Sequence, residues 1–249
     1  QALAGVMRSR CTTFVLLLLL PIRAASKHAH NNSKVYLTFE TCGGLTNQRI
    51  AIVQGLMAAS VMHVTAVLPQ LNLNGVQRPQ EDYREDRSSL VGFSTFYERE
   101  AVGAELALLG VHVASVDEER RLGTYPRQPI VIRGKQRSSR WYKQIVAQSL
   151  ENRSSSPAEA KQPLVLAADC AFLALDMRGD PRLRELFWKV DGTLSSVAPS
   201  IREQAAEAVS RLAELSRARG VADGHFNALH VRVESDWVEH CRKWEGGPP

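Results

Sequence analysis

Two adjacent glycines near the start of the chain stand where a strand pattern gives way to a helix pattern. The apolar residues 35–39 are typical of a buried strand, and residues 45–62 carry apolar side chains at helical spacing. Between them lies the sequence GGLTNQR, residues 43–49, here called the glycine loop. Glycine lets the backbone turn tightly and approach a ligand, and a helix start offers unpaired N–H groups at the positive end of its dipole. The pattern predicts a phosphate site formed by Gly43, Gly44, Asn47 and Gln48, with added charge from Arg49.

A second group of polar side chains follows a strand pattern near the other end of the chain. The sequence HVRVESDW occupies residues 230–237, and Cys241 lies four residues after its tryptophan. Alternate residues of a strand share a face, so we expect His230, Arg232 and Glu234 to point the same way. An arginine there can bind a pyrophosphate through two hydrogen bonds and stabilise the charge that grows on a departing nucleoside diphosphate. Asp236 and Glu234 can orient Arg232 or a substrate hydroxyl.

Taken alone, each motif also fits a structural role. The glycine loop can be a plain strand–turn–helix joint, and the second motif an edge strand with a salt-bridged arginine. Together, however, the two motifs resemble the two signatures of the GDP-fucose protein O-fucosyltransferases, in the same order and at a similar separation. The resemblance covers about residues 34–245, and its specificity comes from those two segments.

The resemblance implies two Rossmann-like domains that face each other across a cleft, the glycosyltransferase B arrangement. It implies transfer of fucose from GDP-fucose to a Ser or Thr hydroxyl, with inversion and without a metal ion. The donor is then a substrate, and no separate cofactor is expected. The expected partners are a nucleotide-sugar donor and a protein or glycan acceptor with a free hydroxyl.

The resemblance also assigns roles by position. Arg232 matches the family's arginine at the diphosphate, and Asn47 matches the asparagine that contacts the donor. Gly43 and Gly44 match the turn beside that asparagine, while Asp236 matches an acidic residue near the donor. Some members place a glutamate base next to the glycine loop. Glu40 is near that place but out of register, so the base stays unassigned.

The elements that must position these motifs alternate between strand and helix. We expect strands at residues 64–68, 111–116, 129–132, 164–166 and 228–233. We expect helices at 93–109, 138–150 and 199–219, the last capped by Ser196 or Ser200 and ended by Gly220. A polar loop is expected at 72–90 and a solvated turn at 117–121. The alternation predicts an α/β fold, a Rossmann-like doubly wound parallel sheet with its ligand site at the carboxyl ends of the strands.

The composition argues against several classes of function. The chain has 249 residues with 31 basic and 26 acidic side chains. Four of the basic residues lie in residues 1–27, which hold no acid, and this leaves 27 basic residues against the 26 acidic ones. Because no basic stripe remains, we expect no nucleic-acid partner. The cysteines and histidines lack the spacing of a metal site, so we expect no metal.

The first residues have the pattern of a targeting segment. Arg8 and Arg10 precede an apolar run, residues 14–20, and two small residues follow it at Ala24 and Ala25. A helix of about ten residues reaches about 15 Å, roughly half of a bilayer core. The pattern predicts a cleaved secretory signal or a short anchor at residues 12–22. The expected location is the lumen of the endoplasmic reticulum or Golgi, or outside the cell.

The cysteines and two glycosylation sequons fit that compartment. Outside the leader, which holds Cys11, the cysteines are Cys42, Cys170 and Cys241. They allow one disulfide with one free thiol, or a further pairing beyond Pro249. The triplets Asn31-Asn32-Ser33 and Asn152-Arg153-Ser154 are acceptor sequons for N-glycosylation.

The predicted organisation has three parts. A leader and stem occupy residues 1–33, an N-terminal Rossmann-like domain occupies 34–227, and 228–249 begin a second, donor-binding domain that is largely missing from this chain. The guanine-binding segments of the family follow the arginine motif. Two alternatives stay open: transfer of another deoxysugar such as rhamnose from a UDP donor, and a non-catalytic secretory binding module.

Overall fold

A parallel four-stranded sheet forms the centre of the molecule. The computed structural model describes residues 34–73, 90–132, 135–154, 159, 161–171 and 174–227. The strand order is β2-β1-β6-β5. The strands are β1 (Val35–Glu40), β2 (Thr65–Ala66), β5 (Arg127–Ile130) and β6 (Leu164–Cys170). The predicted α/β fold with a parallel sheet is therefore confirmed, and it is consistent with a Rossmann-like domain.

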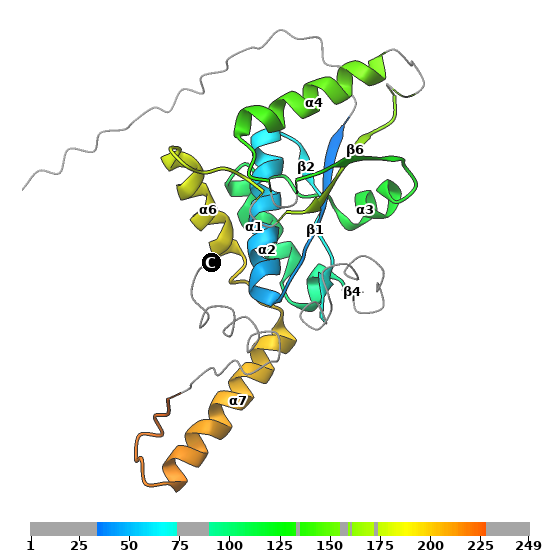
Figure 1. The fold of residues 1–249 in the computed structure, drawn as a ribbon. Coiled ribbons are helices and arrows are strands. Elements are labelled where there is room, and N and C mark those ends of the chain that lie inside the picture. The colour runs from blue at the N-terminus through cyan, green and yellow to red at the C-terminus, as the bar shows by residue number, and fades with distance from the viewer. Residues whose placement is uncertain are drawn as a thin grey trace, which may run out of the picture. The chain divides into compact units, whose positions relative to one another are not determined.

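Six α-helices and one 3₁₀ helix, η3 (Phe93–Thr95), are present in the described residues (Figure 1). The α-helices are α1 (Leu45–Met62), α2 (Arg99–Leu108), α3 (Val116–Leu122), α4 (Ser139–Ser154), α6 (Pro181–Thr193) and α7 (Pro199–Ala218). The bounds of α1 agree with those expected from the apolar spacing. Its residue Gly55 lies against β1, because an added Cβ there would stand 2.5 Å from the ring of Phe39. Glycine thus lets α1 approach the sheet closely.

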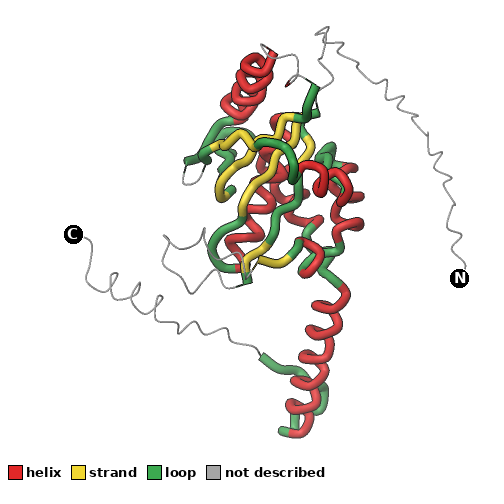
Figure 2. The backbone as a smooth tube through the Cα atoms, turned by 90° about the vertical axis from the view of Figure 1, so that its right-hand side faces the viewer, coloured by secondary structure: helices red, strands yellow, loops and turns green. Residues whose placement is uncertain are grey.

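Helices cover both faces of the sheet. Helices α4 and α6 contact α1, so all three lie on the face that carries Leu37 and Phe39. Helix α3 lies on the other face, where Tyr36, Leu122 and Val165 form a second, smaller apolar cluster. Figure 2 shows the strands of the sheet side by side between the helices. This arrangement is the one that βαβ alternation predicts.

The expected helix at residues 93–109 was wrong at its start. Helix α2 begins at Arg99, and a 3₁₀ turn precedes it. Tyr97 forms an isolated antiparallel bridge with Val197, a residue 100 positions further along the chain. The Glu98 N–H also donates to the Ser196 carbonyl at 2.8 Å. These long-range bonds hold the backbone extended before α2, which local apolar spacing could not indicate.

The expected strand at 111–116 and the expected turn at 117–121 were also wrong. The strand is reduced to one bridge between Val113 and Ala66. The charged turn is α3, which begins with a capping box: the Ser115 hydroxyl accepts from the Glu118 N–H, and the Glu118 carboxylate accepts from the Ser115 N–H. The sequence pattern S-x-x-E signals this start.

Two further helices depart from the sequence expectations. Helix α6 was not expected; the Asp180 carboxylate caps it and Pro181 opens it. For α7, the expected cap at Ser196 or Ser200 was wrong, since the N-cap is Ala198 and Pro199 is the first helical residue. Gly220 follows α7 with φ +92°, as expected for a helix end.

The ends of the expected polar loop form a short antiparallel pair, β3 (Leu71–Asn72) with β4 (Leu90–Val91). Several predictions lie outside the described residues: the targeting segment with its anchor at 12–22, the strand at 228–233 and the arginine motif. Among the helices that are described, none combines the length and the apolarity needed to cross a bilayer.

Candidate functional site

The glycine loop adopts a turn that requires glycine at its first position. Gly43 follows β1 with φ +76°, a backbone region that side chains rarely adopt. An added Cβ at Gly43 would also lie 2.9 Å from Asn47 Nδ2, closer than a real contact allows. The turn therefore brings the backbone over the Asn47 side chain at the point where α1 begins.

The start of α1 carries no side-chain cap. Gly44 is the N-cap residue, and with no side chain it leaves the first N–H groups of the helix uncapped. No acidic residue lies in the first turn. The exposed Asn47 lies in that turn. A helix start of this kind favours an anionic group through its N–H groups and dipole.

A cavity of about 420 Å³ lies beside this turn. One wall is the end of β1 and the loop after it: Thr38, Phe39, Glu40, Thr41, Cys42 and Gly43. The other walls come from residues 67–70 after β2, from Asn72 and Leu90 of the hairpin, and from Glu119 and Arg127. Its volume is in the range of small-molecule sites, and much of its wall lies where the predicted fold places ligands.

Both signs of charge line this cavity. Glu40 and Arg127 are exposed side chains in its wall. The Glu119 carboxylate also lines it and accepts a hydrogen bond from Arg99 at 2.7 Å, and Arg99 donates to the Ala114 carbonyl at 2.8 Å as well. The cavity can thus offer a carboxylate to a hydroxyl and a guanidinium to an anion.

Gln48 holds the loop from within the protein. Its side chain is 1% exposed. Its Nε2 donates to the Gly43 carbonyl at 2.9 Å and to the Asn72 carbonyl at 2.7 Å, and its Oε1 accepts from the Asn72 N–H at 2.8 Å. Both amide protons are in use, so Gln48 positions the turn instead of offering a free donor to a phosphate.

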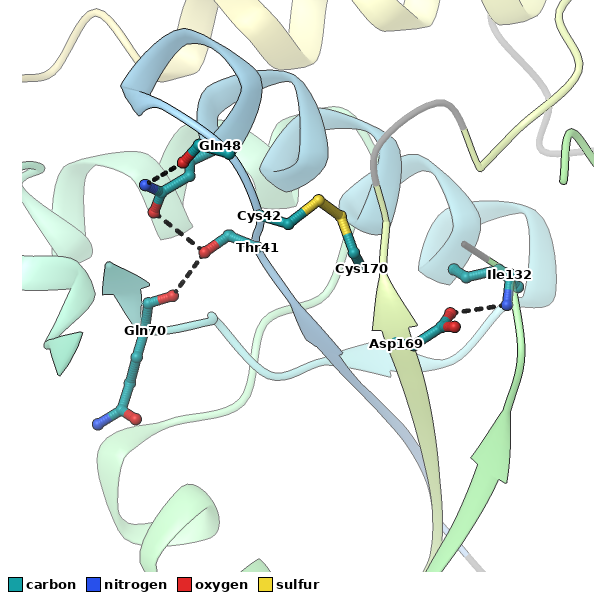
Figure 3. The surroundings of a disulfide bond; sticks show 8 residues. Thr41, Cys42, Gln48, Gln70, Ile132, Asp169 and Cys170 are labelled. Carbon is teal, nitrogen blue, oxygen red and sulfur yellow. Dashed lines mark hydrogen bonds between the residues drawn. A yellow bond between two sulfur atoms is a disulfide. The ribbon is translucent and has the colours of Figure 1, made fainter. Parts of the chain in front are cut away.

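The Thr41 hydroxyl extends this network to the next strand. It lies 3.1 Å from Gln48 Oε1 and 3.0 Å from the Gln70 carbonyl (Figure 3). Its single proton can be donated to one of them at a time. The loop after β1 is thereby bonded to the segment that follows β2.

Covalent and polar links also join the other strand ends. A disulfide connects Cys42, just before Gly43, with Cys170 at the end of β6 (Figure 3). The Asp169 carboxylate accepts from the Ile132 N–H at 2.7 Å, which links the end of β6 to the segment after β5. Of the pairings that the sequence left open, the described residues thus show Cys42 with Cys170.

Arg49 is directed at α6. Its Nε donates to the Asp191 carboxylate at 2.7 Å, while its terminal nitrogens donate to the carbonyls of Asp191 and Leu194 at 2.8 and 3.0 Å. The hydrogen bond to Asp191 raises the pKa of Arg49 above its ordinary value. Its guanidinium thus caps the C-terminal end of α6 and holds the first turn of α1 there.

The structure brings together only some of the site residues that the sequence predicts. Gly43 lines the cavity, Gly44 and Asn47 follow it at the start of α1 but are not among the wall residues, and Gln48 is buried. His230, Arg232 and Asp236 lie outside the described residues. Within the described part, no group of three or more His, Cys, Asp or Glu side chains could hold a metal ion.

Two charged residues of the cavity wall were not identified from the sequence as site residues. Arg127 lies at the start of β5 and Glu119 in α3. From the sequence, Glu119 was expected in a solvated turn. Its partner Arg99 lies 20 residues away in the chain, and local patterns do not reveal a contact at that separation. For Arg127, the available signal was the alternation of side chains along strand β5, which assigns each residue to one face of the sheet.

Comparison with curated proteins shows a similarity over most of this chain. The chain is 26% identical over 212 residues to O-fucosyltransferase 6 of Arabidopsis thaliana. The match covers 85% of this chain and 32% of that protein, so the chain spans about a third of its relative's length. No family model matches the chain, and no solved structure matches it either. The sequence is therefore similar to an O-fucosyltransferase, which supports a glycosyltransferase-like enzyme.

Proposed function

We propose that this chain is part of a glycosyltransferase that moves fucose from GDP-fucose to a Ser or Thr hydroxyl of a protein. The observation that carries the proposal is the Gly43 turn at the start of α1, which forms a wall of the 420 Å³ cavity. The similarity to an O-fucosyltransferase of Arabidopsis thaliana supports the same reading. Activity belongs to the whole protein in which these residues act.

In this proposal the diphosphate of the donor lies at the N-terminal end of α1. The uncapped N–H groups after Gly44 and the amide of Asn47 donate to its oxygens. Arg232, with His230 and Asp236 near it, neutralises the charge that develops on the leaving group, which is the work a metal ion does in other transferases. No metal ion and no cofactor besides the donor is needed.

The acceptor hydroxyl approaches in the cavity beside Glu40. Its oxygen forms a bond to the anomeric carbon of fucose as the bond from that carbon to the β-phosphate oxygen breaks, and GDP leaves with the electron pair. The hydroxyl proton passes to the Glu40 carboxylate, which is exposed in the cavity wall. Attack from the face opposite the diphosphate inverts the anomeric centre.

The disulfide also supports a location in the secretory pathway. Disulfides persist in oxidising compartments and are rare in the cytosol. The Cys42–Cys170 pair therefore fits the lumen of the endoplasmic reticulum or Golgi, or the outside of the cell.

The test is a transfer assay with labelled GDP-fucose and hydroxyl-bearing protein acceptors. Glu40→Gln should lower transfer by about 10²–10⁴-fold, the usual contribution of a positioned base. The matched control is Glu185→Gln, which removes a carboxylate of α6 paired with Lys189 outside the cavity wall.

The outcomes of this assay distinguish three functions: fucosyl transfer, transfer of another sugar and non-catalytic binding. Transfer that depends on Glu40 but not on Glu185 supports the proposal. Transfer from UDP-rhamnose but not from GDP-fucose would replace the sugar while keeping the enzyme class. No transfer from either donor by the whole protein would place the chain in the class of non-catalytic binding modules.

A further inference from the structure

The triplet Asn152-Arg153-Ser154 lies at the C-terminal end of α4, a part of the molecule that the proposed transfer does not use. The side chain of Asn152 is exposed. Because Asn152 is the third residue from the end of α4, its backbone lies in the final turn, where helices fray most readily.

The topology places this turn away from the candidate site. Helix α4 leads from the carboxyl end of β5 to the amino end of β6, so its last turn lies at the amino edge of the sheet. The cavity wall at residues 40–43 lies after β1, at the carboxyl edge. Figure 1 shows α4 and the start of α1 at opposite ends of the sheet.

Helix α4 and the cavity also lie on different faces of the sheet. Helix α4 packs against α1. It also reaches β5, where Gln128 Nε2 donates to the Ser149 hydroxyl at 2.7 Å. Gln128 alternates along β5 with the cavity residue Arg127, which therefore points to the opposite face. A large group on Asn152 would thus extend on the side away from the cavity.

We infer that Asn152 carries an N-linked glycan. The Cys42–Cys170 disulfide gives an argument independent of the triplet, because disulfides form in the oxidising compartment where such glycans are attached. Of the asparagines in the described residues, Asn152 alone is followed two positions later by Ser or Thr. The inference goes beyond the proposed transfer and does not depend on it.

The reaction joins two components. Asn152 Nδ2 forms a bond to the anomeric carbon of a polyprenyl-diphosphate-linked oligosaccharide, and the bond from that carbon to its phosphate oxygen breaks. The polyprenyl diphosphate leaves with the electron pair, and the amide releases one proton. The Ser154 hydroxyl is the recognition element of the triplet.

The test expresses the full chain in eukaryotic cells behind a standard cleavable secretory leader, with Asn31→Gln to remove the other sequon. Peptide-N-glycosidase should shift the secreted protein to a smaller size and convert Asn152 to Asp in the mapped peptide. The whole shift should be lost in Asn152→Gln and in Ser154→Ala. It should be kept in Ser154→Thr, which preserves the hydroxyl.

Peptide mapping can also be done on the chain with native Asn152 and Ser154, so this result does not depend on whether the variants fold. A secreted protein with the Cys42–Cys170 disulfide formed and an unmodified Asn152 peptide would overturn the inference. So would an enzyme-sensitive shift that persists in the double variant lacking both Asn31 and Asn152. Failure of the transfer assay has no bearing on either result.

Discussion

At the scale of single residues, the candidate site depends on a backbone conformation more than on any one polar group. Gly43 combines φ +76° with a position at which a Cβ would lie 2.9 Å from Asn47 Nδ2. Gln48 then fixes the same turn through bonds to the carbonyls of Gly43 and Asn72. The groups offered to a ligand are therefore held in place before it arrives.

Gly43→Ala should destabilise the protein by about 1–2 kcal/mol, because a side chain in this region clashes with the neighbouring carbonyl. The measurement is the denaturant midpoint of unfolding. Gly103→Ala is the matched control: Gly103 lies inside α2, and an added Cβ there would meet no atom within 4 Å. Alanine there should stabilise the helix by about 0.5–1 kcal/mol. Equal effects at the two glycines would contradict the assigned turn.

The roles of single residues were only partly predictable from the sequence. The glycine turn before a helix follows from neighbouring residues, and so its place was correctly expected. The role of Gln48 was not, since its partner Asn72 lies 24 residues away. Arg49 likewise looked like a phosphate ligand, whereas its partner Asp191 is 142 residues away. Local patterns do not encode such distant partners.

At the scale of elements, α3 is anchored to the sheet by one carboxylate. Glu118 accepts from the Ser115 N–H at 3.0 Å, from the Tyr36 hydroxyl at 3.0 Å and from Lys34 Nζ at 3.2 Å. The Ser115 N–H above all, then Lys34 and Tyr36, lower the pKa of Glu118 to about 2. The helix that borders the cavity through Glu119 thus depends on a charge at its own start.

This lowered pKa predicts a pH dependence of stability. A carboxyl whose pKa falls on folding contributes stability above its unfolded pKa, near 4.5, and loses it as pH falls towards 2. Glutamine also serves in a capping box, so Glu118→Gln tests the charge alone. The variant should be less stable than the wild type at pH 7, and the difference should shrink between pH 4.5 and pH 2. The unfolding free energy measured against pH checks this.

Ser115→Ala provides the contrast for that measurement. It removes the hydroxyl, which accepts from the Glu118 N–H and also donates to the Glu118 carboxylate at 3.2 Å, but keeps the Ser115 N–H from which that carboxylate accepts. Its cost of about 1 kcal/mol, usual for a lost helix cap, should depend less on pH than the cost of Glu118→Gln, because the bond to the Glu118 N–H does not involve the charge. A Glu118→Gln difference that is constant down to pH 2 would refute the assigned charge effect.

Elements with strong local signals were predictable, and the others were not. The bounds of α1 and the start of β1 followed from apolar spacing. Helix α2 starts later than its apolar pattern because Tyr97 pairs with Val197. Helix α3 could have been found from Ser115 and Glu118, but the charges around them favoured a turn reading.

At the scale of the whole molecule, the carboxyl edge of the sheet is joined across its strands. The Cys42–Cys170 disulfide closes a sequence separation of 128 residues between the glycine loop and the end of β6. Asp169 and Thr41 make the corresponding links to the segments after β5 and β2. These links bear directly on the cavity, because Thr41 and Cys42 are among its wall residues.

Removing the disulfide should lower stability by about 2–5 kcal/mol, the range for closing a long loop. Cys42→Ser, Cys170→Ser and the double variant should be equally destabilised, since either change removes the same bond. Thermal unfolding of the oxidised proteins checks this, and reduction should bring the wild type to the level of the variants. Wild-type stability that is unaffected by reduction would show that the bond is not formed in solution.

The most direct test of the account titrates the full chain with inorganic pyrophosphate, because its central claim is a diphosphate site at the glycine turn. We expect saturable binding that Asn47→Ala weakens by on the order of tenfold to a hundredfold, the loss of one hydrogen bond to a charged group. Gln204→Ala, an exposed amide on α7, should leave binding unchanged. Binding that Asn47→Ala does not weaken, or no binding of pyrophosphate at all, would contradict the account.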